Sequence, residues 1–282
     1  MRIWKTSRRS LDYGGRALVM AILNVTPDSF SDGGAISNVD DALRKAEKFT
    51  AEGADILDVG GESTRPGSAR ISIDEEIRRV VPVIEEIAKR FEIPISVDTS
   101  KGEVATRAIE AGAEIINDIS GLRFDETIAD VAAGSGCGLV LMHSRGEFEN
   151  MHSQPPVADI LKEVSNDLRR ALSLAKDRGV AAQAIALDVG IGFGKAAEQN
   201  LELIAKLDKL TAEFKAYPML IGTSRKSFIG KLLNDAPVTE RLAGSLTTAM
   251  IAVWKGAKIL RVHDVKETVD SVRMISAIRD QL

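Results

Sequence analysis

The sequence of 282 residues carries 37 Lys and Arg against 41 Asp and Glu, a formal net charge of −4, and 44% of its residues are hydrophobic. This composition is typical of a globular protein. The absence of a concentrated block of Lys or Arg argues against nucleic acid or an anionic membrane surface as a partner. A single cysteine, Cys137, and only three histidines exclude an internal disulfide and a thiolate zinc or iron–sulfur site, so we expect a cytoplasmic protein.

The apolar stretch 17–23 follows the pair Arg8 and Arg9, an order that also occurs in twin-arginine export signals. The stretch is only seven residues long and runs straight into Asn24 without a small-residue cleavage site. No apolar run approaches the ~20 residues that span a bilayer. We interpret the stretch as the first strand of a sheet.

Short aliphatic runs recur along the chain, each ended by a polar residue and followed by an amphipathic stretch. Nearly continuous runs of this kind indicate parallel strands that are buried on both faces. Eight strands are predicted, over residues 18–24, 54–60, 94–98, 114–118, 138–143, 184–188, 219–224 and 257–263. Eight units in 282 residues leave about 35 residues each, a normal length for a strand, a loop and a helix in a barrel.

The segments between the strands have helical patterns. Asp40 and Asp41 open one that stops at Gly53, and residues 74–90 form another with Pro82 inside it, where we expect a kink. Later helices are predicted over residues 158–178, 201–214, 240–254 and 264–282. The alternation predicts an α/β protein with one (β/α)8 TIM-barrel domain over residues 1–282, in which residues 1–17 cap the barrel floor and residues 18–282 form the barrel.

A doubly wound open sheet is the competing architecture. It would place a glycine-rich dinucleotide loop after the first strand, and residues 24–27, with the sequence NVTP, are not such a loop.

The predicted strands end in polar residues, and in such barrels the active site lies at these ends. Solvent exposure would explain any single one equally well, but all the ends together indicate an enzyme. The polar ends are Asn24, Asp58, Asp98, Asn117, His143, Asp188, Ser224 with Lys226, and Arg261 with His263.

Two loops have the composition of anion-binding segments, and three strand ends suggest a heterocycle site. Residues 60–67 combine glycines, hydroxyls and Arg65, and residues 224–227 carry Lys226 where a helix opens. Asp98, Asn117 and Asp188 offer acceptors that match the N–H groups of an aminopyrimidine-like ring. The pattern favours a flat heterocycle that carries a diphosphate. A phosphosugar isomerase would need a Glu base opposite a His, and no such pair is evident.

Long motifs resemble dihydropteroate synthases over nearly the whole chain. The two signatures are ILNVTPDSFSDGG at 22–34 and DVGGESTRPG at 58–67. The similarity continues through SVDT at 96–99, INDISG at 116–121, GIGFGK at 190–195, GTSRKS at 222–227 and RVHDV at 261–265.

This resemblance implies a TIM-barrel enzyme that condenses 6-hydroxymethyl-7,8-dihydropterin diphosphate with 4-aminobenzoate, giving 7,8-dihydropteroate and diphosphate in folate biosynthesis. It also implies Mg²⁺ as cofactor, bound by Asn24, and a homodimer, for which the apolar helix 246–254 offers a face. The implied pterin and diphosphate site consists of Thr64, Asp98, Asn117, Met142, Asp188, Phe193, Gly222, Lys226, Arg261 and His263. The implied aminobenzoate site consists of Phe30, Thr64, Pro66, Lys226 and Ser227.

The resemblance implies catalytic roles for Asn24, Arg65, Asp98, Lys226 and His263. Mg²⁺, Arg65 and His263 would neutralise the diphosphate, which leaves before the weakly nucleophilic aromatic amine attacks, so no strong general base is required. Because Phe30, Thr64, Pro66 and Ser227 match the ordinary pattern, we predict inhibition by sulfonamides that mimic aminobenzoate.

The sequence departs from the family pattern at few positions. Ala21 replaces a usual Gly, Val189 stands where Pro commonly follows Asp188, and the residues 143–146, HSRG, differ from the common HMQG. The methyl of Ala21 can be accommodated at an interior strand position, and the other two changes affect the sixth and fifth loops rather than the pocket.

Two other functions remain as alternatives. A tetrahydrofolate-using methyltransferase would share the Asp and Asn strand ends but have no use for the diphosphate loops. A pterin-binding sensor without activity would lack anion or Mg²⁺ residues, and none of these is missing from the sequence.

Overall fold

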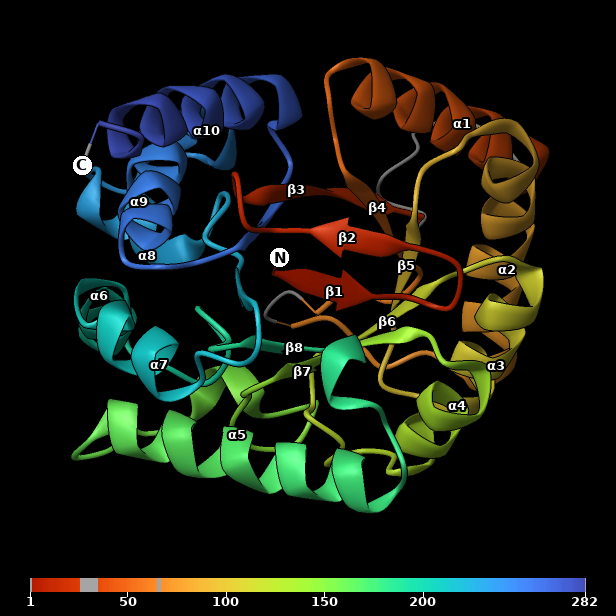
Figure 1. Cartoon of the computed structure of the whole chain (residues 1–282), viewed down its shortest axis with the longest axis horizontal. Helices are drawn as coiled ribbons and strands as arrows, with labels where there is room; N and C mark the ends of the chain where they lie inside the picture. The colour runs from red at the N-terminus through yellow and green to blue at the C-terminus, as the bar shows by residue number, and fades with distance from the viewer. Residues whose placement is uncertain (1, 26–34, 65–66, 282) are drawn as a thin grey trace.

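A computed structural model of the protein describes residues 2–25, 35–64 and 67–281, with the side chains of residues 35–38 outside the description (Figure 1). Within these residues, eight parallel strands close into a barrel in the order β10-β3-β4-β5-β6-β7-β8-β9, which confirms the predicted (β/α)8 fold. The strands are β3 Leu18–Asn24, β4 Ile56–Gly60, β5 Ile95–Asp98, β6 Ile115–Asp118, β7 Gly138–Met142, β8 Ile185–Asp188, β9 Met219–Ile221 and β10 Ile259–Val262.

The barrel strands divide their side chains between two apolar layers, because successive residues of a strand point to opposite faces. Val19, Leu57 and Ile116 face outward and belong to the main core between strands and helices. Met20 and Ile56 alternate with them and fill the barrel interior. Burial on both faces explains why the strands are nearly continuous apolar runs.

The helices form a ring outside the barrel (Figure 1). Among the described helices, none is long and apolar enough to cross a membrane. Their bounds are α1 Ala35–Ala51, α2 Ile73–Arg90, α3 Gly102–Ala111, α4 Thr127–Ser135, α5 Ile160–Asp177, α6 Ala197–Ala205, α7 Leu207–Glu213, α8 Ser227–Leu232, α9 Leu242–Trp254 and α10 Val265–Arg279, with 3-10 turns η2 Met151–Ser153, η3 Ala182–Ala184 and η4 Val238–Glu240.

Several helix bounds differ from the predicted ones. α1 begins at Ala35, before the predicted start at Asp40, whereas α2, at Ile73–Arg90, differs by one residue from the predicted helix 74–90 and contains Pro82 as predicted. The predicted helix 201–214 is two helices, because Lys206 leaves the helical conformation (φ −112°, ψ 20°) between them. Ile204 and Leu207, on either side of the break, are both buried.

A short hairpin precedes the barrel and lies across its face in Figure 1. β1 Ile3–Lys5 pairs antiparallel with β2 Ser10–Asp12. Trp4 is fully buried against the inward residues at the beginnings of the strands, such as Leu18 and Ile115, and its Nε1 donates to the Ala184 carbonyl at 2.7 Å. The indole therefore fills the barrel floor and leaves the opposite end for a site.

Candidate active site

At the carboxyl ends of five of the eight barrel strands the inward side chain is polar. Each lies two residues after an inward-pointing residue of the same strand, as Asp58 follows Ile56 and Arg261 follows Ile259. The period of two brings them to the barrel mouth, where alternate strands contribute to two adjacent layers. The inward residues of the mouth are Ile22, Asp58, Asp98, Asn117, Met142, Asp188, Gly222 and Arg261.

A hydrogen-bonded cluster occupies the centre of this mouth. Arg261 Nε donates to Asp58 Oδ2 at 2.6 Å, and Arg261 Nη2 donates to Asp98 Oδ2 at 2.5 Å. Asn117 Nδ2 donates to the same Asp58 oxygen at 3.2 Å. Asp58, to which the sequence analysis assigned no role, is therefore the residue that joins two predicted site residues. Its position two residues after a buried isoleucine is the sequence signal that marks it as inward.

The two other carboxylates of the mouth have raised pKa values. Burial raises the pKa of Asp98 to about 7, with the Arg261 charge opposing and the Asp58 charge adding to the shift. Burial also raises the pKa of Asp188 to about 6, against the hydrogen bond that Gly190 N donates to its Oδ1 at 2.7 Å. Perturbed carboxyl groups gathered in a barrel mouth mark a functional site.

An apolar wall and a lysine flank the carboxylates. Phe193 and Met142 pack in one buried cluster with Phe148 and Met151 from the loop after β7. Lys226 Nζ lies 4.1 Å from the centroid of the Phe193 ring. Burial and the nearby Arg261 lower the pKa of Lys226 to about 8. The wall offers a flat apolar surface beside a cation.

His263 and Ser224 meet at the ends of neighbouring strands, with His263 Nδ1 3.0 Å from Ser224 Oγ. Burial, and the charges of Arg261 and Arg225, lower the pKa of His263 to about 3. His263 is therefore neutral at neutral pH and offers a hydrogen bond rather than a charge. Arg225 is turned away from the mouth and forms an ion pair with Asp264, whereas Ser227 is exposed at the start of α8.

Comparisons with known proteins give the family of this chain. The family described as "Pterin binding enzyme" matches residues 20–263, and dihydropteroate synthase of Escherichia coli (strain K12) is 48% identical over 261 residues, 92% of this chain and 90% of that protein. This chain belongs to the dihydropteroate synthase family. It is an enzyme, a transferase.

Solved structures of the family have the same fold at full length. The Yersinia pestis dihydropteroate synthase with a sulfonamide drug complex is 43% identical, with 99% of each chain covered and a TM-score of 0.91. The Burkholderia cenocepacia dihydropteroate synthase complexed with 7,8-dihydropteroate is 41% identical, with 99% of this chain and 97% of that chain covered and a TM-score of 0.89.

The first two loops of this dihydropteroate synthase family member are described in part. Phe30, Arg65 and Pro66, predicted for the aminobenzoate and diphosphate sites, lie outside the described residues. Asn24 ends β3 beside Gly60, where an added Cβ would lie 3.6 Å from Asn24 Oδ1 and 3.7 Å from Asp98 Oδ2. The Asn24 amide is therefore at the rim of the same mouth.

The base of the second loop is held by a buried ammonium. Lys101 Nζ donates to Glu62 Oε1 at 2.8 Å, to Glu76 Oε2 at 2.5 Å and to the Ile71 carbonyl at 2.9 Å. Glu62 and Ile71 are the two ends of the segment that carries Thr64. On the far side, His152 Nε2 lies 2.7 Å from the Thr64 carbonyl oxygen. The loop that supplies Thr64 is thus tied to α2 and to η2.

Lys195 is a further residue whose role the sequence analysis missed. Its Nζ donates to the carbonyls of Gly190 at 2.7 Å and Phe193 at 3.0 Å, and to that of His143 at 3.3 Å. Burial lowers the pKa of Lys195 to about 7. It closes the loop that presents Phe193, and its place at the end of the glycine-rich motif is the signal that could have found it.

His143 does not join the mouth, although it ends a predicted strand. Met142, one residue earlier, faces inward, so His143 points to the helix side, where its Nε2 lies 3.9 Å from Glu163 Oε1. Burial, with the nearby Lys195 charge, lowers the pKa of His143 to about 2. It is a neutral core histidine.

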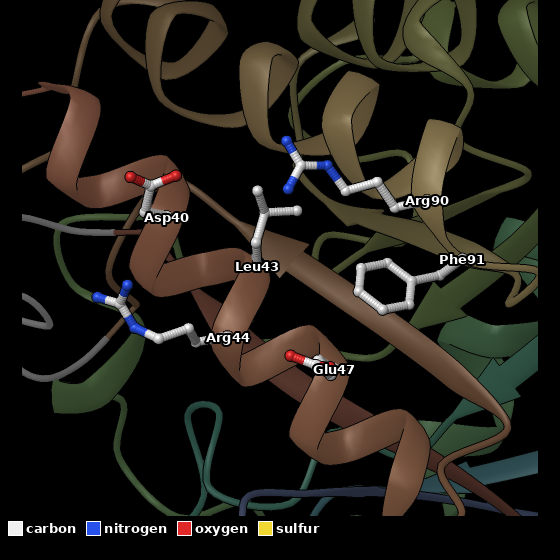
Figure 2. Close-up of a pocket in the computed structure, with 6 residues that line it drawn as sticks. All are labelled: Asp40, Leu43, Arg44, Glu47, Arg90 and Phe91. Atoms are coloured by element: carbon white, nitrogen blue, oxygen red, sulfur yellow. The ribbon is translucent and has the colours of Figure 1, made fainter.

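Of two cavities on the described surface, one is lined by a predicted site residue and the other is not. One of about 390 Å³ lies between the second loop and the loop after β7, lined by Thr64, Gly67, Ser68, Ala69, Phe148, Glu149, Met151, His152 and Ser153. Another of about 290 Å³ lies on the outer ring between α1 and the end of α2 (Figure 2). Its six side chains, from Asp40 to Phe91, include no predicted site residue.

The described residues contain no group of three or more His, Cys, Asp and Glu side chains that could hold a metal ion. Mg²⁺ usually keeps several waters and binds through one or two protein oxygens together with substrate phosphates. Asn24 Oδ1 at the rim fits a Mg²⁺ site of this kind, in which the ion arrives with a diphosphate.

Proposed function

We propose that this chain condenses 6-hydroxymethyl-7,8-dihydropterin diphosphate with 4-aminobenzoate to form 7,8-dihydropteroate and diphosphate, a step of folate biosynthesis. The observation that carries the proposal is the mouth itself, in which Asp98, Asn117 and Asp188 surround Arg261 beside Lys226 and the Phe193 ring. The Burkholderia relative, whose structure is complexed with 7,8-dihydropteroate, supports the product.

The pterin would lie flat in the mouth. Its N–H groups would donate to Asp98, Asn117 and Asp188, because carboxylate and amide oxygens are acceptors. Arg261 would stack on one face and Met142 and Phe193 would line the pocket, since an apolar wall and a guanidinium plane both suit a flat ring. Gly222 leaves room beside Arg261, whose Cβ lies 3.8 Å from where a Cβ at position 222 would be.

The diphosphate would lie at the rim, against Thr64, Arg65, Arg261, Lys226 and His263. The pKa of His263 supports a neutral N–H donor at this position, so the positive charge would come from the arginines and Lys226. Asn24 would hold Mg²⁺ on the diphosphate, where the ion supplies charge neutralisation to the leaving group.

The bond from the pterin methylene to the diphosphate oxygen would break first, with its electron pair leaving on the diphosphate. The methylene cation is stabilised by the electron-rich dihydropterin, and the aminobenzoate nitrogen then forms the new C–N bond and loses a proton to solvent. Because the amine lone pair is free at neutral pH, the chain's residues supply position and charge rather than a strong base.

The amine would lie between Lys226, Ser227 and Thr64, together with Phe30 and Pro66 of the first two loops. Ser227 is exposed at the entrance, one residue after the ammonium that contacts the ring wall. The Yersinia relative, solved with a sulfonamide drug complex, supports sulfonamide binding by this chain, for which we propose the same position.

A cytoplasmic homodimer is the form in which we propose that the enzyme works. α9 and α10 lie side by side (Figure 1) and expose large apolar side chains, with Trp254 52% and Met274 64% exposed. Such a patch is typical of a subunit interface. Sedimentation equilibrium should give twice the chain mass of 30.4 kDa, and a monomer at micromolar concentration would reject the dimer.

The experiment that tests the reaction measures diphosphate release with both substrates, with each alone and with neither. Release that requires the pterin diphosphate and forms dihydropteroate only with the amine is expected. Release without the amine would support the dissociative first step, whereas no release with both substrates would reject the synthase.

A further inference from the structure

Asp58 lies between two residues of the pterin site, Arg261 and Asn117, and is hydrogen-bonded to both. We propose that Asp58 is a positioning residue that determines ring specificity, because it holds the Asn117 amide with its oxygen toward the ligand. The inference rests on the proposed function only in that the ligand is a flat nitrogen heterocycle in the barrel mouth.

The geometry places Asp58 out of reach of a ligand. It is fully buried on β4, and its Oδ1 is buried too, with no hydrogen-bond partner among the described residues. Its Oδ2 accepts from Arg261 Nε at 2.6 Å and from Asn117 Nδ2 at 3.2 Å. Asn117 is on β6, two strands along, so the contact crosses the inside of the barrel above Ser96, the neighbour of Asp58 on β5. Asp58 therefore acts through its partners.

The Asn117 side chain has one donor end and one acceptor end, and a carboxylate accepts only. The Arg261 guanidinium donates to the same oxygen, so Asp58 Oδ2 acts as an acceptor in both contacts. If the amide turned over, its oxygen would face the Asp58 oxygen at a residue with 3% exposure, and the Asn117 oxygen would have no donor while Asp58 Oδ2 kept only the bond from Arg261 Nε. One orientation is thus strongly preferred, and in it Asn117 Oδ1 is the free end.

The consequence is a mouth that presents acceptors in all three ring-facing positions. Asp98 and Asp188 contribute carboxylate oxygens, and Asn117 contributes Oδ1 rather than its NH₂. A ring edge with N–H and NH₂ groups is matched, whereas a ring with a carbonyl in place of the amino group meets oxygen against oxygen. Specificity for an amino-bearing ring is therefore set partly by a residue that does not touch it.

The test compares binding of pterin, which carries an amino group at ring position 2, with lumazine, which carries an oxygen there. Titration calorimetry on the purified full chain would give both dissociation constants for the wild type, Asp58→Leu, Asp58→Asn and the control Ser96→Ala. Ser96 is a buried neighbour whose hydroxyl has no partner among the described residues. Folding of each variant is checked by circular dichroism.

We expect the wild type and Ser96→Ala to prefer pterin. Asp58→Leu removes the acceptor, so pterin binding should weaken about 10- to 100-fold and the pterin-to-lumazine preference should fall at least about tenfold. Asp58→Asn can still turn an oxygen to Asn117 and should keep most of the preference. Equal weakening of both rings in Asp58→Leu, or an unchanged preference, would overturn the proposal.

A measurement on the wild type guards against a variant that does not fold. In protein labelled with ¹⁵N-asparagine, with Asn117→Ser to assign the signal, the Asn117 NH₂ should exchange slowly with solvent because one proton is bonded to Asp58. Fast exchange would contradict the proposal. Both readouts are independent of turnover, so a failed condensation assay would count against the synthase and not against the role of Asp58.

Discussion

Lys226 and Phe193 meet across the mouth of the barrel, with the Lys226 ammonium 4.1 Å from the centroid of the Phe193 ring. The two residues come from the loops after β9 and β8. Gly192 makes the approach possible, because a Cβ there would lie 3.1 Å from Lys226 Cδ, at a φ of +84° that favours glycine. The ammonium thus lies where the heterocycle, the diphosphate and the amine are proposed to meet.

Replacing Lys226 or Asp98 by Ala should reduce kcat/KM for the condensation by about 100-fold or more, because each removes a charge from the reacting region. Circular dichroism should show an intact fold. Lys209→Ala, at an exposed position on α7, is the control and should keep full activity. Turnover at the wild-type rate in either site variant would be incompatible with the proposed roles.

The condensation rate should follow a narrow bell against pH. Asp98, with its pKa raised to about 7, is charged above that pH, and Lys226, with its pKa lowered to about 8, is cationic below that pH. Activity should therefore fall as pH drops through about 7 and again as pH rises through about 8. In Lys226→Arg the alkaline limb should move to higher pH in whatever activity remains, and an alkaline limb that stays in place would assign it to another group.

Gly190→Ala should destabilise the chain more than Gly136→Ala, although the two glycines have nearly the same φ, +68° and +67°. A Cβ at position 190 would lie 1.8 Å from the His143 carbonyl oxygen, whereas at position 136 no described atom lies within 4 Å. Strain alone costs about 1–2 kcal/mol, so urea unfolding of Gly136→Ala should show that loss and Gly190→Ala a larger one. A raised KM for the pterin diphosphate is also expected for Gly190→Ala, since Phe193 is on the same loop. Equal losses of stability would contradict the close approach.

Lys101→Met should lower the free energy of unfolding by about 3–5 kcal/mol, because it leaves Glu62 and Glu76 buried without their cation. The KM for the pterin diphosphate should rise as the loop that carries Thr64 loses its anchor. Lys89→Met breaks an exposed pair with Glu86 and is the matched control. Equal free energies of unfolding in urea and equal KM values in the two variants would refute the role of Lys101 as the anchor of this loop.

Sulfonamides that mimic aminobenzoate should inhibit the condensation competitively with the amine and not with the pterin diphosphate. We expect this because the drug and the amine would occupy the same position, between Lys226 and Ser227. Initial rates at varied amine and drug concentrations measure it. Uninhibited turnover at saturating drug would show that the amine pocket of this chain differs from the proposed one.

The sequence by itself determined the barrel and most of the polar residues at its mouth. Aliphatic runs such as 18–24 and polar ends such as Asp98 and Asp188 are local features, because strand periodicity and burial on both faces leave a pattern in consecutive residues. The motifs also indicated the family, which the comparisons confirmed. Helix bounds were less well predicted, as the break at Lys206 between α6 and α7 shows.

Only the tertiary structure decided how those residues work together. Asp58 meets Arg261 across 203 positions of sequence, and Met142 rather than His143 enters the mouth because the strand's register in the closed barrel selects which residue points inward. The charge states of His263 and Lys226 depend on burial and on cations brought by other strands. Hydrogen bonds and charge interactions of this kind form between segments that are distant in the sequence, so no local pattern of residues predicts them.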